Sequence, residues 1–234
     1  MISGKRQINW LPEIILKNRK PFIPEIEPEL LKYNDKLWKK IFPYKKDIKF
    51  DNYQLSNIGR YSMIYPNDAI MISKIIRGFI HNNKASITDA TANMGGVSLA
   101  FTEYFDSVNA VEIIPFHSKI LENNIKVYNV ENKVKVYNND YIDIADKLEQ
   151  DVVFFDPPFG GPDYKNETIM DLYLDNISIA DIANSLLEKK IIVAIRVPFN
   201  YDFKKLLGLS DKSNVYTFYK LNGSLNYFLV ILDH

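Results

Sequence analysis

Short apolar runs alternate with longer amphipathic segments over most of the chain. Each apolar run is short enough for one buried strand, and each is followed by a segment with helical spacing. The predicted strands cover residues 86–90, 108–113, 133–137, 151–155 and 190–196, and the predicted helices cover 96–105, 115–129, 141–148, 178–188 and 201–209. Strands that alternate with helices in this way build a doubly wound, mostly parallel sheet with helices on both faces.

The end of the chain has a different pattern. Residues 214–220 and 225–232 are strand-like and flank Asn222-Gly223, a pair that favours a tight hairpin turn. Five parallel strands closed by a hairpin resemble the class I S-adenosylmethionine-dependent methyltransferase fold, in which the last strand inserts antiparallel. We therefore expect an α/β fold of this Rossmann-like class, with a mostly parallel seven-stranded sheet and a C-terminal hairpin.

The first quarter of the chain does not follow the alternation. Three prolines within residues 1–25 predict an arm with little regular structure. Residues 28–41 have helical spacing, with Pro28 near the first turn. We therefore predict that residues 1–66 form a basic, helical extension that contributes to substrate binding.

A further helix is predicted before the first strand. It covers residues 67–82, with Asn67 as its N-cap and branched apolar side chains on one face. Because this helix leads directly into the alternating pattern, residues 67–234 are predicted to form the methyltransferase domain. A monomer is expected.

Charge is divided unevenly along the chain. The 234 residues contain 29 Lys and Arg and 29 Asp and Glu, and the net charge is zero. Residues 1–50 hold 12 of the basic and 6 of the acidic residues, so this part carries +6 and the remainder −6. A basic arm on an acidic body favours contact with phosphates, although a solvated lysine-rich helix face has the same composition. Lys45, Lys46 and Lys49 are the expected phosphate contacts.

Several classes of protein are excluded by composition. The absence of Cys excludes disulfides, zinc-thiolate sites and Cys nucleophiles. His81, His117 and His234 are scattered, so no metal site is expected, and no apolar run is long enough to enter a membrane. We expect an intracellular protein of the nucleus or cytoplasm. The richness in Lys, Asn, Ile and Tyr is typical of AT-rich genomes and favours a large DNA virus, acting in the host cytoplasm, or a protist.

The loop after the first predicted strand has the composition of a ligand-binding turn. It reads Asp89-Ala90-Thr91-Ala92-Asn93-Met94-Gly95-Gly96, and in an open α/β sheet ligands bind at the carboxyl ends of the strands. Small residues and paired glycines let the backbone approach a ligand, although a simple tight turn is the alternative. The run is not Gly-x-Gly-x-x-Gly, and an acid at its start suits an ammonium and a sulfonium group better than a pyrophosphate. The expected contacts are Asp89, Ala90, Thr91, Asn93, Gly95 and Gly96.

Acids also follow the next three strands. Glu112, with Ile113 beside it, is placed to accept hydrogen bonds from two ribose hydroxyls. Asp140 is placed to accept from an adenine amine while Tyr141 covers the ring, and Asp156 ends the fourth strand. Each acid alone is most often a surface carboxylate. Four of them at successive strand ends predict that the cofactor is S-adenosylmethionine.

The fourth strand is followed by the run Asp156-Pro157-Pro158-Phe159-Gly160-Gly161-Pro162-Asp163-Tyr164. Rigid carbonyls and a flat ring are the groups needed to methylate an exocyclic amine of a nucleobase, because the amine must be held in line and the ring clamped. Asp156 and the Pro157 carbonyl are predicted to accept from the amine, and Phe159 to stack on the base. These three are the predicted catalytic residues, and a Pro/Gly surface turn is the alternative.

This nonapeptide resembles the Pro-Pro-Trp-Gly-Gly-Pro signature of trimethylguanosine synthases. The Gly95-Gly96 pair is similar to that family's donor loop, Arg60-Tyr61-Ser62-Met63-Ile64-Tyr65-Pro66 to its Phe-Ser-Val-Thr-Pro segment, and Lys49-Phe50-Asp51 to a Lys-Leu-Asp. The resemblance covers about residues 32–232. It implies methylation of guanine N2 in 7-methylguanosine (m7G) caps, with m7G-capped RNA or an m7G nucleotide as the partner. The implied substrate contacts are Ser62, Pro158, Phe159 and Tyr164.

Two positions depart from the family pattern. Phe159 stands where the family has Trp, and Val197-Pro198-Phe199-Asn200 stands where it has a Leu-Pro-Arg-Asn-like run. Arg196 is the nearest guanidinium, so Arg196 or the three lysines are expected to replace the missing phosphate contact. Asn200 is a further expected substrate contact. Two other functions stay open: an amino-methyltransferase acting on adenine N6 or guanine N2 within RNA or DNA, and a catalytically silent cap-binding subunit.

Overall fold

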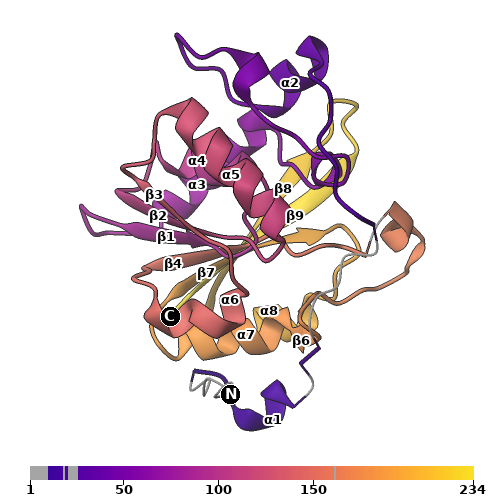
Figure 1. Ribbon diagram of the computed structural model, residues 1–234. Helices are drawn as coiled ribbons and strands as arrows, with labels where there is room; N and C mark the ends of the chain where they lie inside the picture. Colours follow the sequence, from indigo (N-terminus) through magenta and orange to yellow (C-terminus); the bar gives the residue numbers. More distant parts are fainter. Residues whose placement is uncertain (1–9, 18, 21–25, 161) are drawn as a thin grey trace, which may run out of the picture.

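A seven-stranded sheet in the order β3-β2-β1-β4-β7-β9-β8 forms the centre of the molecule (Figure 1). The structure is a computed structural model that describes residues 10–17, 19–20, 26–160 and 162–234. The strands are β1 (Ser86–Asp89), β2 (Ser107–Val111), β3 (Val134–Tyr137), β4 (Val152–Phe155), β7 (Ile192–Pro198), β8 (Lys212–Tyr219) and β9 (Leu225–Asp233). The first five are parallel, and β9 runs antiparallel to β7 and β8. The predicted mostly parallel sheet with a C-terminal hairpin is confirmed.

The side chains of β4 show why its sequence is a continuous apolar run. Val152 and Phe154 belong to the apolar core on one face of the sheet, and Val153 and Phe155 belong to the core on the other. Successive side chains of a strand point to opposite faces, so a central strand covered on both sides needs an apolar residue at every position.

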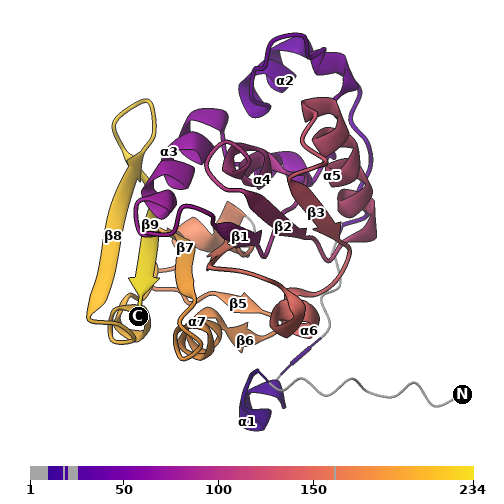
Figure 2. The ribbon, with the colours of Figure 1, turned by 90° about the vertical axis from the view of Figure 1, so that its left-hand side faces the viewer.

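Helices cover both faces of the sheet (Figures 1 and 2). On one side lie α3 (Pro66–Arg77), α4 (Gly96–Phe101) and α5 (Pro115–Tyr128), and on the other lie α6 (Tyr141–Ile144), α7 (Ile179–Leu187) and α8 (Lys204–Leu207). The shorter elements are α1 (Glu13–Leu16), α2 (Asp35–Ile41), the 3-10 turns Phe50–Asn52, Gly59–Tyr61, Ala145–Lys147 and Pro162–Asn166, and the ribbon of β5 (Tyr173–Leu174) and β6 (Ile177–Ser178). The predicted helices 141–148 and 201–209 therefore have only four α-helical residues each.

The N-terminal extension packs on the face of the sheet that carries α4 and α5. Trp38 of α2 is buried, and its Nε1 donates to the Tyr53 carbonyl at 2.8 Å. The rings of Phe42 and Tyr53 are stacked, with centroids 4.4 Å apart. These side chains and Leu55 belong to the same apolar cluster as the helices beneath them. The extension and the sheet thus share one core on this face.

The predicted start of the first extension helix at Pro28 was wrong. Helix α2 begins at Asp35, because the Asn34 side chain accepts from the backbone N–H of Leu37 at 2.9 Å and caps the helix. Upstream, Leu30 forms an isolated antiparallel bridge with Ser56 instead of continuing the helix.

Asn67 was also wrongly predicted to be an N-cap. Helix α3 begins one residue earlier, at Pro66, with Tyr65 in the cap position, and Asn67 lies inside the first turn. Proline is favoured at the first helical position because its fixed φ suits the helix and its missing N–H would have no partner there. The helix ends at Arg77 rather than at residue 82.

Part of the predicted N-terminal arm is ordered against the opposite face of the sheet. Trp10 is buried, and its Nε1 donates to the Ile142 carbonyl at 2.8 Å. Helix α1 follows directly, where no regular structure was predicted. Residues 1–9, 18 and 21–25 of the arm lie outside the described residues.

Candidate functional site

The carboxyl ends of β1 and β4 lie side by side at the point where the chain changes direction across the sheet. From β1 the chain crosses through α4 on one face to β2, and from β4 it crosses through α7 on the other face to β7. Such a switch point leaves a crevice between the two crossover connections. Asp89 ends β1, and Asp156 follows β4.

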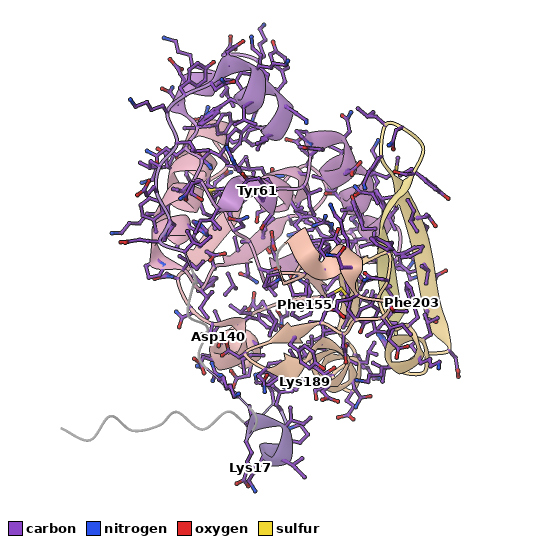
Figure 3. The ribbon with its side chains drawn as sticks, turned by 90° about the vertical axis from the view of Figure 1, so that its right-hand side faces the viewer. Lys17, Tyr61, Asp140, Phe155, Lys189 and Phe203 are labelled. Carbon is purple, nitrogen blue, oxygen red and sulfur yellow. The ribbon has the colours of Figure 1, made fainter. Side chains whose placement is uncertain are left out.

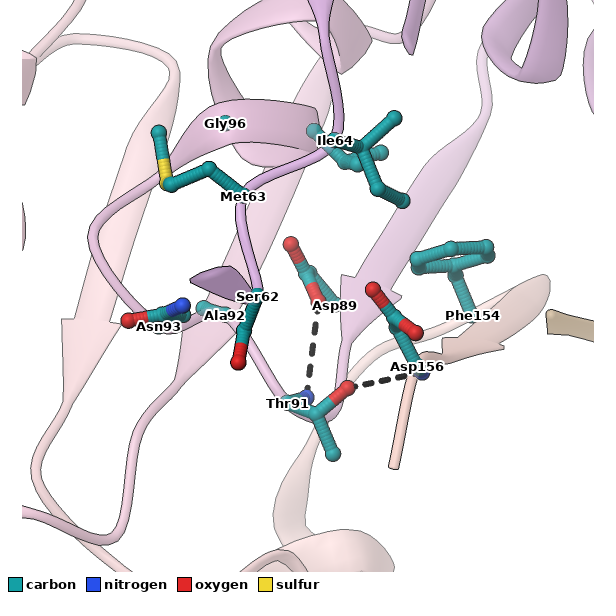
Figure 4. Close-up of a pocket in the computed structure, with 11 residues that line it drawn as sticks. Ser62, Met63, Ile64, Asp89, Thr91, Ala92, Asn93, Gly96, Phe154 and Asp156 are labelled. Atoms are coloured by element: carbon teal, nitrogen blue, oxygen red, sulfur yellow. Dashed lines mark hydrogen bonds between the residues drawn. The ribbon is translucent and has the colours of Figure 1, made fainter. Parts of the chain in front are cut away.

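A small pocket opens at this position (Figure 4). It encloses about 20 Å³, roughly the space of one water molecule. Its lining residues are Ser62, Met63, Ile64, Asp89, Thr91, Ala92, Asn93, Gly96, Val97, Phe154 and Asp156. Four of the six expected contacts in the first loop line this pocket together with Asp156 and the predicted substrate contact Ser62. The four are Asp89, Thr91, Asn93 and Gly96.

Asp89 is held in place from within its own loop. Its side chain is buried, Oδ2 accepts from the Ser98 hydroxyl at 2.6 Å, and Oδ1 accepts from the Thr91 backbone N–H at 3.4 Å. Burial raises the pKa of Asp89 to about 7, and the nearby charge of Asp156 adds to the rise. A cationic ligand would stabilise the ionised form, so the carboxylate is suited to an ammonium or sulfonium group.

Asp156 forms an ion pair with Arg196. The register of β4 and β7 pairs Phe155 with Ile195. Asp156 and Arg196, which follow this pair, are therefore neighbours. Nη1 of Arg196 lies 2.9 Å from both carboxylate oxygens of Asp156. Burial raises the pKa of Asp156, and Arg196 opposes that rise. This contact uses only Nη1 of the guanidinium, so phosphate binding by Arg196 stays a prediction.

The geometry of the first loop favours glycine at both positions. Gly95 has φ +96°, and a Cβ there would lie 2.8 Å from Cδ1 of Leu121. A Cβ on Gly96 would lie 3.1 Å from the Met63 side chain and 3.3 Å from the Ile64 carbonyl. The segment that precedes α3 thus lies directly on the N-terminus of α4.

Glu112 connects the donor loop to the extension. Its Oε2 accepts from the backbone N–H of Asn93 at 2.8 Å, and its Oε1 accepts from that of Ile114 at 2.8 Å. Behind it, His117 lies with Nδ1 4.0 Å from Oε1 and Nε2 2.9 Å from the Ser56 hydroxyl. Burial raises the pKa of Glu112 to about 7 and lowers that of His117 to about 4. His117 and Ser56 were not predicted to belong to the site.

Glu112 does not line the pocket between β1 and β4, and both of its oxygens already accept a backbone N–H. Each oxygen keeps a second lone pair for a ribose hydroxyl. Ile113, the next residue, is 37% exposed at the carboxyl edge of β2.

Asp140 is paired with a residue of the N-terminal arm. Figure 3 labels Asp140 in the part of the molecule that also carries Lys17 of the arm. The Arg19 guanidinium contacts Asp140, and its Nη1 and Nε lie 2.7 Å from Asp143 and 2.9 Å from Asp175. Burial raises the pKa of Asp140 to about 7, and Asp175 adds to the rise. Arg19 thus pairs with the carboxylate that was predicted to accept from an adenine amine. No spacing in the sequence relates these residues, which lie 121 positions apart.

Tyr141 is not placed to cover an adenine ring. Its side chain is 2% exposed and lies edge-on to Phe155 and Trp10, in the apolar core below the sheet. Its position in the first turn of α6 turns the ring inward, because Asp140 caps that helix by accepting from the Ile142 N–H at 2.8 Å.

An aromatic group follows Asp156. The Phe159 ring is partly exposed, lies edge-on to Tyr164 at 5.3 Å, and has the Arg196 guanidinium 5.1 Å from its centre. Asn200 is buried and donates from Nδ2 to the carbonyls of Tyr164 and Glu167, both at 2.8 Å. Asn200 therefore holds the loop that carries Tyr164. Pro158 is exposed at its start, and Gly161 lies outside the described residues.

Lys45, the first of the three predicted phosphate lysines, lies at the end of α5, away from the pocket. Lys45 donates to the carbonyl of Tyr128 at the last residue of α5, whereas Ser56 of the extension contacts His117 near its first turn. These two positions on the helix are about 16 Å apart at the rise of an α-helix. Lys46 and Lys49, which lie between Lys45 and Ser56 in the sequence, are exposed.

The pH dependence of stability provides a test of the buried acid. A raised pKa means that folded Asp89 retains its proton over a range, about pH 4 to 7, in which the unfolded chain has lost it. The stability contributed by that difference is therefore lost as the pH rises through this range. Measured against Asp89→Asn, the melting temperature of the wild type is expected to fall by at least about 3 °C between pH 4.5 and 7.5.

The comparison with Asp89→Asn removes the opposite trend of His117, whose lowered pKa makes stability rise with pH and is present in both proteins. Melting curves of the two proteins that stay parallel over this range would contradict the assigned environment of Asp89.

Two absences hold for the described part of the chain. No group of three or more His, Cys, Asp or Glu is arranged to hold a metal ion there. No helix found there is long and apolar enough to cross a membrane.

The strand order, the switch-point pocket and the acids at the strand ends define a methyltransferase of the class I fold. A protein of Klebsiella pneumoniae described as an O-methyltransferase has the same fold, with a TM-score of 0.51 at 10% identity over 73% of this chain and 81% of the other. The family model for RNA cap guanine-N2 methyltransferases matches residues 84–234. The chain belongs to this family of enzymes, as its resemblance to trimethylguanosine synthases predicted.

Two relatives indicate the range of the similarity. An uncharacterized protein of Acanthamoeba polyphaga mimivirus is 42% identical over 125 residues, which cover 51% of this chain and 48% of the relative. The trimethylguanosine synthase of Schizosaccharomyces pombe is 27% identical over 161 residues, which cover 66% of each. The chain therefore spans from about half to two thirds of the length of these relatives.

Proposed function

We propose that the protein transfers a methyl group from S-adenosylmethionine to N2 of an m7G RNA cap, giving m2,7G and, after a second transfer, m2,2,7G. The observation that carries the proposal is the pair of carboxylates at the adjoining ends of β1 and β4, with Pro157, Pro158 and Phe159 following directly. We propose that it acts as a monomer on capped RNA or an m7G nucleotide, in the nucleus or cytoplasm where such RNA is found.

The donor site is suited to a cation. S-adenosylmethionine supplies an electrophilic methyl group on a sulfonium and also carries an ammonium. Its amino-acid end would be held by the residues that line the pocket, Asp89, Thr91, Asn93 and Gly96. A positive charge beside Asp89 would stabilise the ionised form of its buried carboxylate. The pocket has only about 20 Å³, so the adenosine would lie beyond it, along Glu112 and Ile113.

The acceptor amine needs positioning more than it needs a strong base. The lone pair of guanine N2 is delocalised into the ring, so holding the amine in line accounts for most of the expected acceleration. Asp156 can accept from an N2 hydrogen because each of its oxygens receives only Nη1 of Arg196 and keeps a free lone pair. The Pro157 carbonyl is the second acceptor. The proton that N2 loses on methylation passes to Asp156 or to water.

The base would stack on Phe159, with Tyr164 at its rim. A 7-methylguanine is cationic, so stacking on an aromatic face gains about 0.5–2 kcal/mol over plain guanine. With Arg196 held by Asp156, the phosphates that follow the cap would meet Ser62 near the pocket and then Lys46 and Lys49 on the extension.

The function is tested by incubating the protein with radiolabelled S-adenosylmethionine and m7GTP, GTP, m7G-capped RNA or an adenine-rich RNA of the same length. We expect label in m7GTP and capped RNA, with N2 as the methylated atom by mass spectrometry. The Asp89→Asn variant should bind the donor about 10- to 150-fold more weakly in calorimetry, because a charge-assisted contact is lost. Label at adenine N6, or donor binding without any transfer, would reject the proposed reaction in favour of the other two functions.

A further inference from the structure

A second and larger cavity lies beside the strand-end pocket. It encloses about 230 Å³ and is bounded by the Pro43–Tyr44 turn of the extension, the first turn of α3, one face of α4 and the end of α5. The α4 face runs from Gly96 at its start to Glu103 just beyond its end, and Tyr128 closes the far side. A volume below that of ordinary drug-sized pockets suits a ligand of the size of one nucleobase.

The two cavities have a common wall at Gly96. This residue lines both of them, and the Met63–Ile64 segment lies against its backbone closely enough to meet a Cβ at 3.1–3.3 Å. Ser62 lines the first cavity and Pro66 the second, so the chain passes from one to the other within four residues. A ligand in the larger cavity is therefore directly next to whatever occupies the strand-end site.

The wall formed by the extension offers an open aromatic face. The Tyr44 side chain is 78% exposed. Its ring is nearly parallel to that of Phe50, at an interplanar angle of 22° and a distance of 6.5 Å. The face away from Phe50 is left without an aromatic partner among the described residues. An exposed ring at the mouth of a cavity is a platform on which any base can stack.

Lysines flank the same cavity. Nζ of Lys45 lies 4.5 Å from the centre of the Tyr128 ring, and Nζ of Lys40 lies 4.8 Å from that of Tyr65, which adjoins Pro66. Lys40 is exposed, and both lysines belong to the part of the chain that carries a net +6. Glu103, an exposed acid that lines the cavity, is an acceptor for the N–H groups of a base and would repel a phosphate. The charges thus favour a base inside and a phosphate at the lysine-lined rim.

We propose that this cavity binds one nucleotide of the RNA chain that follows the cap, with its base on Tyr44 and its phosphate beside Lys40. The proposal rests on the proposed function, because it assumes that an RNA chain leaves the strand-end site. It explains why an aromatic surface with lysines lies next to that site but not within it. An apolar small molecule would form no ion pair with the lysines, and an acidic peptide would not use the exposed Tyr44 ring for stacking.

The test compares a substrate that reaches the cavity with one that does not. Methylation kinetics and fluorescence-anisotropy binding are measured with m7GTP, with an m7G-capped pentaribonucleotide and with the same pentaribonucleotide uncapped. Tyr44→Ala is expected to raise KM and Kd for the capped pentaribonucleotide about 5- to 100-fold, the range for losing one stacked base. Its constants for m7GTP should be unchanged. Tyr219→Ala, which removes a 63% exposed ring from β8, should change neither.

A second variant tests the phosphate contact. Lys40→Gln should reduce the slope of the logarithm of RNA affinity against that of salt concentration by about one. Its neighbour Lys39, paired with Asp35 at 2.8 Å, provides the matched control Lys39→Gln, for which an unchanged slope is expected.

Equal effects of Tyr44→Ala on m7GTP and on the capped pentaribonucleotide, or no effect on either, would overturn the proposal. If the wild type methylates nothing but binds the uncapped RNA through Tyr44, the proposed reaction fails and the nucleotide site stands. If it methylates m7GTP and Tyr44→Ala leaves RNA binding intact, the reaction stands and the nucleotide site fails.

Discussion

Replacing Phe159 by alanine is expected to lower kcat/KM for m7GTP by about 100-fold or more, whereas replacement by tryptophan should preserve it. Loss of one aromatic stack costs about 1–3 kcal/mol, and a base that is no longer clamped also misplaces its amine. The preference for m7GTP over GTP should shrink in the alanine variant, because the cation–π contribution distinguishes the two bases. Arg196 lies 5.1 Å from the ring centre, so the base must use the remaining face.

The competing explanation for Phe159 is packing, because its ring also contacts the apolar core below the sheet. The two roles are separated by measuring the melting temperature beside the ratio of activities on m7GTP and GTP. A lower melting temperature with an unchanged ratio would show that Phe159 supports the loop and does not contact the cap.

The Arg196→Met variant is expected to melt about 10 °C below the wild type. Removing one partner of a fully buried ion pair costs about 3–5 kcal/mol. The side chains of this pair are 18% and 12% exposed, so a cost near the lower value is expected when Asp156 is left without a counterion. The guanidinium also lies 4.4 Å from the centre of the Tyr227 ring and 5.1 Å from that of Phe159, so its loss removes packing as well. Thermal denaturation followed by circular dichroism gives the comparison.

The double variant Asp156→Asn/Arg196→Met should recover part of this loss, since it buries no unpaired charge. Lys39→Met breaks the exposed pair with Asp35, in which both side chains are 58% exposed, and should change stability by less than about 1 kcal/mol. If the double variant is no more stable than Arg196→Met, packing and not the ion pair explains the effect.

The strand-end acids show what a sequence can predict about a site. The apolar run of β4 and the acid that follows it locate Asp156 at the edge of a sheet, and the same reasoning locates Asp89. It does not predict their partners. The contact between Asp156 and Arg196 depends on the register of two strands, and a pattern with period two specifies which face a residue occupies but not which residue lies beside it.

The contacts made by the extension were harder to predict still. Arg19 reaches Asp140 across more than half of the chain, and Ser56 reaches His117 through a buried hydrogen bond. Neither pair carries a local motif, because polar side chains that meet only in the folded state leave no periodic signal. Asn67 illustrates the reverse case, in which a good local signal for a cap yields to the stronger preference of Pro66 for the first helical position.

The core shared by the extension and the sheet affects how much of the chain must fold together. The family model begins at residue 84, yet Trp38, Phe42 and Leu55 cover apolar surface on the helices above the sheet. A chain shortened to residues 84–234 would expose that surface to water and to other unfolded chains. The cooperative unit of this protein is therefore larger than the segment that the family model matches, and residues 84–234 alone are not expected to fold stably.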